Sequence, residues 1–339
     1  MSFARFSLLL VALFVSAFSL ALSRSRADEL PADTNTIKSL TPEQARKQAR
    51  KLVTLSVEQA RQLVERKSGY ILSIDGLKSL DVDVAKVLAR SQNNWLFLNG
   101  LKTIDAETAK SLAGYKGHLG LNDVISLDVD AIRALAEVER AGLFFDGMPT
   151  IDTEAAEAIS RFRGGLLRLD GLTALDADTA SVVARTKAST LALNKLRTID
   201  PETAKSLLQF RGVFHFTALH ETVGQETPLS VDVVKIVCLA ANKAPYAVSL
   251  PGITAFDSLD SIAIAQSLAK RQGPLALPNL KKISPKTLTA LIEKRDVEIP
   301  LVETLELIQE PDGSATEDFI IPEWLEERQR LEERQRQSK

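Results

Sequence analysis

The chain has 339 residues, of which 45% are hydrophobic and 25% are charged, and this is the composition of an ordinary globular protein. Its net charge of −2 gives no electrostatic reason to expect a nucleic-acid partner. Aromatic residues make up only 5%, so aliphatic side chains must fill the interior, and a single cysteine excludes an internal disulfide.

Residues 1–27 have the pattern of a secretory signal peptide. Arg5 supplies the basic part, and residues 6–22 are an apolar run. Ser25 and Ala27 are the small residues of a small-x-small cleavage site before Asp28. Cleavage there removes three arginines and no acid, which leaves 39 basic and 44 acidic residues and a net charge of −5. The sequence therefore predicts an exported protein, in the periplasm, at the cell surface or secreted. The alternative is an uncleaved membrane anchor, since the run is just long enough to span a bilayer.

Residues 28–69 are expected to form a polar lead-in followed by two helices. Thr41 with Pro42, and Ser56, stand where helix N-caps are expected, and the phrases TPEQAR and SVEQAR share one pattern. We interpret these helices as degenerate first units, because the terminal repeats of a solenoid are usually atypical caps.

Residues 70–310 are built on a repeat of 23–24 residues. One copy is LFLNGLKTIDAETAKSLAGYKG at 96–117, and the unit returns about ten times. The second apolar residue of the strand recurs at Ile74, Leu98, Leu121, Phe145, Leu169, Leu193 and Phe216. Self-similarity at this period predicts an α/β solenoid, in which each unit adds one short strand and one helix.

Each regular unit carries an aspartate where its helix should begin. These predicted N-caps are Asp81, Asp105, Asp128, Asp152, Asp176 and Asp200. Apolar residues follow four and seven positions later, as Ala109 and Leu112 do after Asp105. This spacing puts one narrow apolar stripe on one face of each helix, and the stripe is expected to pack against the strands.

The later part of the array is less regular. An insertion at 220–228 separates a strand at 214–216 from a helix expected after Ser230, and further strands are predicted at 248–250, 275–277 and 297–299. Ser284 before Pro285 repeats the cap signal. Residues 311–339 are predicted to be an acidic linker and a charged, solvated helix. Glu326 with Arg330, and Glu332 with Arg336, would support that helix as ion pairs.

The phrase L-x-L-x-G-L-x-x-I-D-x-E-x-A-x-x-L-A at 96–113 resembles the short leucine-rich repeats of exported bacterial proteins. The resemblance covers roughly residues 40–309 and implies a curved strand-plus-helix solenoid that binds partners without catalysis. The chain departs from the common form of that family at one column. Where the family has Asn three residues after the second strand leucine, this chain has Leu77, Leu101, Val124, Met148, Leu172 and Leu196.

Two groups of polar residues are candidates for metal sites. The residues directly after the strands are Asp75, Asn99, Asn122, Asp146, Asp170, Asn194 and Thr217. A cation ladder would concentrate carboxylates, whereas Asp and Asn both favour turns, so a column of turns is preferred. His215, His220 and Glu221 flank the insertion, but their spacing matches no helix-borne zinc motif. No metal, cofactor or catalytic residue is predicted, and Cys238 is expected to be a buried apolar residue.

The strand face offers the best candidate site. Residues between the two apolar strand positions point away from the core, and here they are Ser73, Phe97, Gly120, Phe144, Arg168, Ala192 and His215. Phe97, Phe144 and Arg168, with Trp95 just before the Phe97 strand, are predicted to be exposed and to bind a partner. Cover of the rings by the N-terminal segment or the tail is the alternative.

The sequence thus favours a non-enzymatic scaffold that binds a protein or a component of the cell envelope. Two alternatives stay open: an enzyme with its site at 215–228, and a structural envelope module without a specific ligand. A membrane is expected as a partner only if the N-terminal segment is not cleaved, and nucleic acid is not expected.

Overall fold

The structure is a computed structural model, and it describes residues 49–65, 70–137, 141–227, 229–241, 248–315 and 319–337. The chain divides into two units, Met1–Lys38 and Ser39–Lys339, and every described residue belongs to the second. The predicted signal segment and the predicted helix after Thr41 lie outside the described residues. Within the described ranges, no helix combines the length and the apolar character needed to cross a bilayer.

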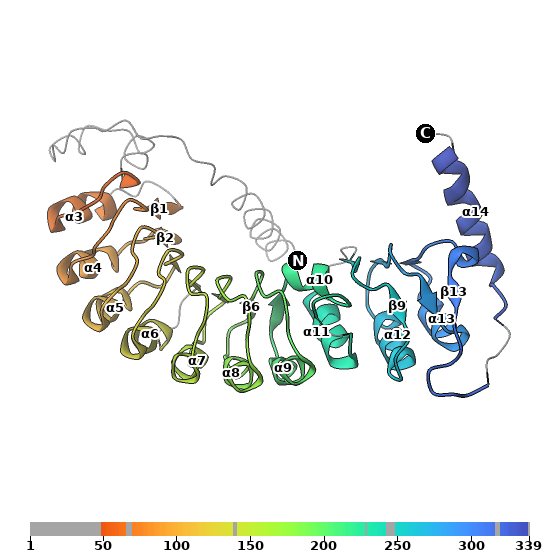
Figure 1. Ribbon diagram of the computed structural model, residues 1–339. Coiled ribbons are helices and arrows are strands. Elements are labelled where there is room, and N and C mark those ends of the chain that lie inside the picture. Colours follow the sequence, from red (N-terminus) through yellow and green to blue (C-terminus); the bar gives the residue numbers. More distant parts are fainter. Residues whose placement is uncertain are drawn as a thin grey trace. The chain divides into compact units, whose positions relative to one another are not determined.

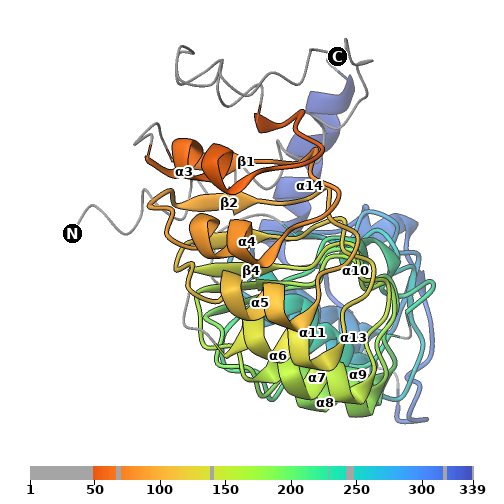
Figure 2. The ribbon, with the colours of Figure 1, turned by 90° about the vertical axis from the view of Figure 1, so that its left-hand side faces the viewer.

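A seven-stranded parallel sheet forms the first part of this unit, and its strands lie in chain order. They are β1 Ile71–Ser73, β2 Trp95–Phe97, β3 His118–Gly120, β4 Gly142–Phe144, β5 Leu166–Arg168, β6 Thr190–Ala192 and β7 Val213–His215. Helix α3 Val57–Glu65 precedes the sheet, and one helix follows each of the first six strands: α4 Val82–Leu88, α5 Ala106–Leu112, α6 Val129–Ala136, α7 Thr153–Ser160, α8 Ala177–Val183 and α9 Pro201–Leu207. Figures 1 and 2 show the units stacked one after another, with helices on one side and strands on the other. The predicted strand-plus-helix solenoid is confirmed.

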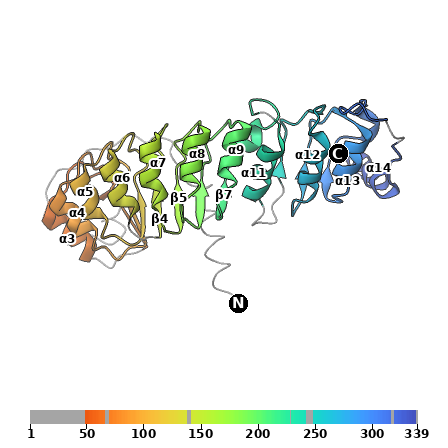
Figure 3. The ribbon, with the colours of Figure 1, turned by 90° about the horizontal axis from the view of Figure 1, so that it is seen from below.

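The core lies between the strands and the helices. Leu96 in β2 and Leu98 directly after it are fully buried. Phe97 between them is partly exposed, as strand alternation requires. The helix stripes are buried too, and Ala109 and Leu112 have no exposed surface. Small alanines on the helices let each helix approach its strand closely. Figure 3 shows the helices following one another along the unit.

The column that departs from the leucine-rich-repeat pattern is apolar and buried. Its members are Leu77, Leu101, Val124, Met148, Leu172 and Leu196, and none is more than 4% exposed. A backbone hydrogen bond closes the turn in place of an Asn side chain, because the N–H of Leu101 donates to the carbonyl of Leu98 at 3.2 Å. The turn is therefore satisfied without a buried amide side chain.

The predicted aspartate caps are confirmed. The carboxylates of Asp81, Asp105, Asp128, Asp152, Asp176 and Asp200 each accept a backbone N–H from the first turn of α4 to α9. The Oδ1 of Asp105, for example, lies 2.7 Å from the N–H of Thr108. This hydrogen bond is the main reason why the pKa of Asp105 lies below its ordinary value. At the start of α3, Ser56 and Gln59 cap each other reciprocally.

The coils after β7 are built differently. Helices α10 Ala218–Thr222 and α11 Val231–Ala241 come first, and a later series alternates strands and helices: β8 Val248–Ser249, β9 Ala255–Phe256, α12 Ser261–Ala269, β10 Leu275–Ala276, β11 Lys282–Ile283, α13 Pro285–Ile292, β12 Val297–Glu298, 3₁₀ helix η2 Val302–Thr304 and β13 Glu306–Leu307. Two three-stranded parallel sheets result, β8-β10-β12 and β9-β11-β13. The first continues the predicted strand positions. The second, and α10 inside the insertion, were not predicted.

Helix α13 begins at the predicted Ser284, but the capping carboxylate comes from elsewhere in the chain. Glu310 is only 3% exposed, and its Oε1 accepts the N–H of Lys286 at 3.0 Å. The hydroxyl of Ser284 donates to the other oxygen of Glu310 at 2.8 Å. A carboxylate at this position also faces the positive end of the helix dipole. Glu310 therefore caps α13 in the way that an aspartate caps each helix of the earlier units.

Helix α14 Glu323–Gln337 covers the last coil, which corrects the prediction of a wholly solvated helix. Leu325 is fully buried, whereas Leu331 is 51% exposed. Gln329 accepts the N–H of Val302 at 3.2 Å and donates to the carbonyl of Pro300 at 3.1 Å. The first half of the helix is therefore fixed by packing and hydrogen bonds that its charged sequence did not reveal. The predicted pair of Glu326 with Arg330 is present at 3.0 Å.

Candidate functional site

The strand face carries two rows of outward side chains, because positions one and three of each three-residue strand share a face. Trp95 is the first residue of β2 rather than its predecessor, and it lies opposite His118 of β3. Phe97 lies opposite Gly120, and Gly120 lies opposite Phe144 of β4. The sequence interpretation followed the third-position row and therefore missed His118, which enters the site from the first-position row.

Four rings on this face form one group, which we call the aromatic cluster: Trp95, Phe97, His118 and Phe144. The ring of Trp95 is stacked on His118 at a centroid distance of 4.0 Å and an interplanar angle of 14°. Its centroid lies 5.5 Å from that of Phe97 and 5.3 Å from that of Phe144. These separations lie in the range of favourable aromatic pairs. Trp95 is thus the centre of the cluster.

Two glycines make room for these rings. A Cβ at Gly142 would lie 2.5 Å from Nδ1 of His118, and a Cβ at Gly120 would lie 2.8 Å from a ring carbon of Phe97. Any other residue at these two positions would push the rings out of place. Bare backbone beside bulky rings lets the rings lie along the sheet rather than stand away from it.

Arg168 fixes the far side of the cluster. Its guanidinium carbon lies 4.6 Å from the centroid of the Phe144 ring, which is a cation–π contact. The same guanidinium binds Asp146 in bidentate fashion, with Nε 2.8 Å from Oδ1, and lies 3.6 Å from a carboxylate oxygen of Asp170. Desolvation raises the pKa of Asp146 above its ordinary value, while the charge of Arg168 opposes this effect. Arg168 therefore holds the Phe144 ring in place, because ion pairs with Asp146 and Asp170 fix the guanidinium against it.

The exposures correct one sequence prediction. Phe144 is 1% exposed, so it is not an accessible contact residue as predicted. It is covered by its neighbours on the strand face, since Trp95, His118 and Arg168 all contact its ring. Trp95, Phe97 and Arg168 remain partly exposed. The surface that a partner could reach is thus formed by Trp95, Phe97 and the edge of His118, with Phe144 as their support.

His118 is held in its neutral form. Burial lowers its pKa to about 4. Its Nδ1 is buried and has no hydrogen-bond partner among the described residues. The imidazole therefore acts as a flat, neutral ring beneath Trp95 at pH 7.

The low pKa of His118 predicts acid sensitivity. The unfolded chain takes up a proton on this imidazole near pH 6.5, whereas the folded chain does so only near pH 4. Protons therefore favour unfolding in this window, and the free energy of unfolding should fall as the pH is lowered from 6.5 to 4. Urea unfolding at several pH values measures the slope. A His118→Phe variant keeps a ring but not the titration, so it should show a shallower slope, and an equal slope would contradict the assignment.

The polar column after the strands lies in turns, as predicted. From Asp75 to Asn194 its members occupy turn positions, and the N–H of Leu77 closes the first turn by donating to the carbonyl of Ile74 at 3.2 Å. The side-chain oxygens of the column accept backbone N–H groups of the next coil, as Asp170 does from Asn194 at 2.9 Å and Asn99 does from Asn122 at 3.2 Å. The column therefore ties neighbouring coils together. Within the described residues, no three His, Cys, Asp or Glu side chains are placed to hold a metal ion.

The described part of the insertion has a structural role. Thr222 and Thr227 are buried and both donate to the carbonyl of Arg197, Thr227 at 3.0 Å. His215 is exposed at the end of β7, and the side chains of His220 and Glu221 lie outside the described residues. Cys238 is buried, as predicted, and burial raises its pKa to about 11, so it is not a ready nucleophile.

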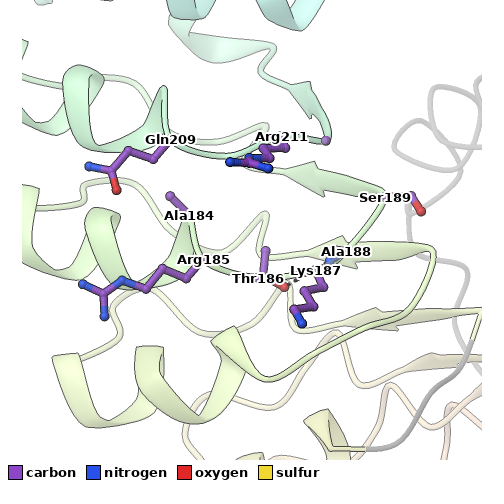
Figure 4. Close-up of a pocket in the computed structure, with 9 residues that line it drawn as sticks. Ala184, Arg185, Thr186, Lys187, Ala188, Ser189, Gln209 and Arg211 are labelled. Carbon is purple, nitrogen blue, oxygen red and sulfur yellow. Dashed lines mark hydrogen bonds between the residues drawn. The ribbon is translucent and has the colours of Figure 1, made fainter.

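A shallow, open depression lies on an edge of the unit, where helices α8 and α9 lead into strands β6 and β7. It is lined by residues 184–189 together with Gln209, Arg211 and Gly212. Figure 4 shows Arg185, Lys187 and Arg211 around it. None of the predicted site residues contributes to this depression.

Comparisons with known proteins identify no family for this chain. No protein-family model matches the chain, and no curated protein matches it. A solved structure of a leucine-rich-repeat protein of Leptospira interrogans is similar at 14% sequence identity and a TM-score of 0.30, over 82% of this chain and 88% of that one. The assignment to a leucine-rich-repeat-like solenoid rests on the strands, helices and register of the chain itself.

Proposed function

We propose that this chain is an exported, non-enzymatic repeat scaffold that binds a protein or another envelope component through its strand face. One observation carries the proposal: a tryptophan and a phenylalanine are stacked on each other and partly exposed on the sheet face. Large rings on the outside of a protein are the side chains that most often dominate interfaces.

The arrangement around Trp95 favours binding because little order has to be gained. His118 of β3 lies against one side of the indole, and Phe144 of β4 contacts it as well. Ordering a side chain on binding costs about 0.5–1.5 kcal/mol, and this cost is reduced when the side chain is already fixed. The rings are thus prepared for contact before a partner arrives.

Export is part of the proposal and rests on the sequence of residues 1–27 alone. Cleavage after Ala27 would give a mature chain that begins at Asp28. The same segment retained would give an anchored form with the scaffold outside the membrane.

The binding proposal is tested with a Trp95→Ala, Phe97→Ser double variant of residues 28–339. The immobilised chain is exposed to an envelope extract, and captured proteins or glycans are quantified by mass spectrometry. Because hot-spot side chains are worth about 2 kcal/mol or more each, we expect retention to fall at least about tenfold.

The matched control is Ile125→Ser, which removes another exposed apolar side chain, 60% exposed, from a loop outside the strand face. It should retain the captured partner at the level of the unmodified chain. Circular dichroism verifies that both variants are folded. Undiminished capture by the double variant would exclude the strand face as the binding site.

A further inference from the structure

Charge is distributed unevenly between the two ends of the repeat helices. The helices begin with acidic caps, whereas the loops that leave them and lead to the next strand carry exposed basic residues: Arg90, Lys116, Arg161, Arg163, Arg185, Lys187 and Arg211. Cations at helix C-termini stabilise the helix dipole, but most of these residues lie beyond the last helical turn. Their position calls for a second explanation.

The five residues Arg161, Arg163, Arg185, Lys187 and Arg211, here called the basic edge, belong to three consecutive loops. These loops lead into β5, β6 and β7, which pair in register and lie about 4.8 Å apart. The loops contain no aspartate or glutamate between residues 161 and 169, 184 and 193, or 208 and 216. Positive charge therefore recurs from coil to coil along one line.

Most of this charge is not neutralised within the described part of the chain. Arg161 pairs with Glu137 at 2.9 Å, and both side chains are exposed to solvent. No ion pair involves Arg163, Arg185, Lys187 or Arg211 among the residues that the structure describes. The acids of α8 and α9 stand in their first turns, about 10 Å away along a seven-residue helix.

Hydrogen bonds tie these loops to one another. The N–H of Lys187 donates to the carbonyl of Phe162 at 3.0 Å, and the N–H of Val213 donates to the carbonyl of Ser189 at 2.9 Å. Thr186 donates from its hydroxyl to the same carbonyl of Phe162 at 3.0 Å. Backbone hydrogen bonds between consecutive loops thus fix the Cα positions from which the charged side chains extend. This lowers the entropic cost of binding.

We propose that the basic edge is a second binding surface of this chain, and that its ligand is an acidic polysaccharide. A linear polymer with repeated anionic groups matches a line of charges that recurs from one coil to the next. Arginine can bind a carboxylate or sulfate through two parallel hydrogen bonds. The neutral Gln209 and Ser189 are exposed beside the basic side chains and suit the hydroxyl groups of sugars.

The lack of accessible aromatic rings in these loops favours a polysaccharide over a single-stranded nucleic acid as the ligand. Proteins that bind single strands stack bases on accessible aromatic rings. The rings in these loops are Phe162 at 0% exposure and Phe210 at 5%, so neither offers such a platform. The surface supplies charge and hydrogen bonds without stacking.

The experiment measures binding of residues 28–339 to heparin, polygalacturonate, inorganic polyphosphate and oligo(dT) by fluorescence anisotropy at low salt. We expect heparin and polygalacturonate to bind more tightly than the other two, with an affinity that falls as salt is added. The triple variant Arg185→Ala, Lys187→Ala, Arg211→Ala should bind the polysaccharides about tenfold more weakly, since exposed charge pairs contribute up to about 1 kcal/mol each.

The matched control removes the same number of charges from the outer face of three helices, with Lys86→Ala, Lys110→Ala and Lys205→Ala. These lysines are exposed and belong to α4, α5 and α9. This variant should bind like the unmodified chain, because the outer face of the helices is a separate surface. Equal loss in the control, no loss in the first triple variant, or binding of only polyphosphate or oligo(dT) would overturn the proposal.

Discussion

Replacement of Leu98 by alanine is expected to lower the free energy of unfolding by about 2–5 kcal/mol. Leu98 is fully buried directly after β2, and its N–H donates to the carbonyl of Gly120 in the next coil at 2.9 Å. Removal of its side chain leaves a cavity between stacked coils, which neighbours fixed by their own hydrogen bonds cannot fill. Urea unfolding followed by circular dichroism measures the loss.

Asp105→Ala is the comparison for this variant, because it lies in the same unit and removes a cap rather than a core side chain. The loss of its hydrogen bond to Thr108 should cost about 0.5–2 kcal/mol. If Asp105→Ala destabilises the chain more than Leu98→Ala does, the assignment of core and cap positions is wrong.

Gly100→Ala is the second substitution for which we expect a large effect. A Cβ at this position would overlap the carbonyl oxygen of Asp75 and lie 2.5 Å from that of Leu77 in the preceding coil. Both are backbone atoms that cannot rotate away, so the coils must separate. We expect a loss of about 1–3 kcal/mol or more, read from the midpoint of urea unfolding.

The chain offers a matched control for this glycine. Lys195 occupies the same turn position in a later unit and is exposed. Lys195→Ala should therefore leave the unfolding midpoint nearly unchanged. A similar loss in both variants would mean that the turn is sensitive to composition rather than to the close approach of the coils.

The glycines of these turns also show what a sequence pattern can hide. Asp-Gly and Asn-Gly pairs suggest a turn in which glycine supplies a positive φ. Among the described residues, only Gly224, Gly273 and Gly313 have positive φ, and Gly100 does not. Glycine is needed at Gly100 because the preceding coil lies against it. This is a contact between residues about one repeat apart, and a local sequence pattern cannot predict it.

The regular half of the fold was predictable because each unit repeats the same local signals. Strand alternation placed Leu98 in the core, and the aspartate before each helix predicted the cap at Asp105. Where a partner comes from a distant segment, prediction failed. Glu310 caps α13 across 24 residues, and the sequence around Ser284 does not contain that information.

The candidate site was predicted in part for the same reason. Alternation correctly turned Phe97, Phe144 and Arg168 toward the strand face. It could not show that Phe144 is covered, because this depends on Trp95, His118 and Arg168 from three other strands. His118 itself was detectable, since it stands at the first position of its strand as Trp95 does. A sequence reading of both outward rows would have included it.

The way in which α14 closes the last coil has a consequence for solubility. The carbonyl of Val297 in β12 faces away from β10, and Arg328 of α14 donates to it, while Gln329 takes the N–H of Val302 and the carbonyl of Pro300. An open strand edge is a template on which another chain can add, and proteins avoid aggregation by blocking it. A charged helix laid over this edge blocks the addition of another strand to β12.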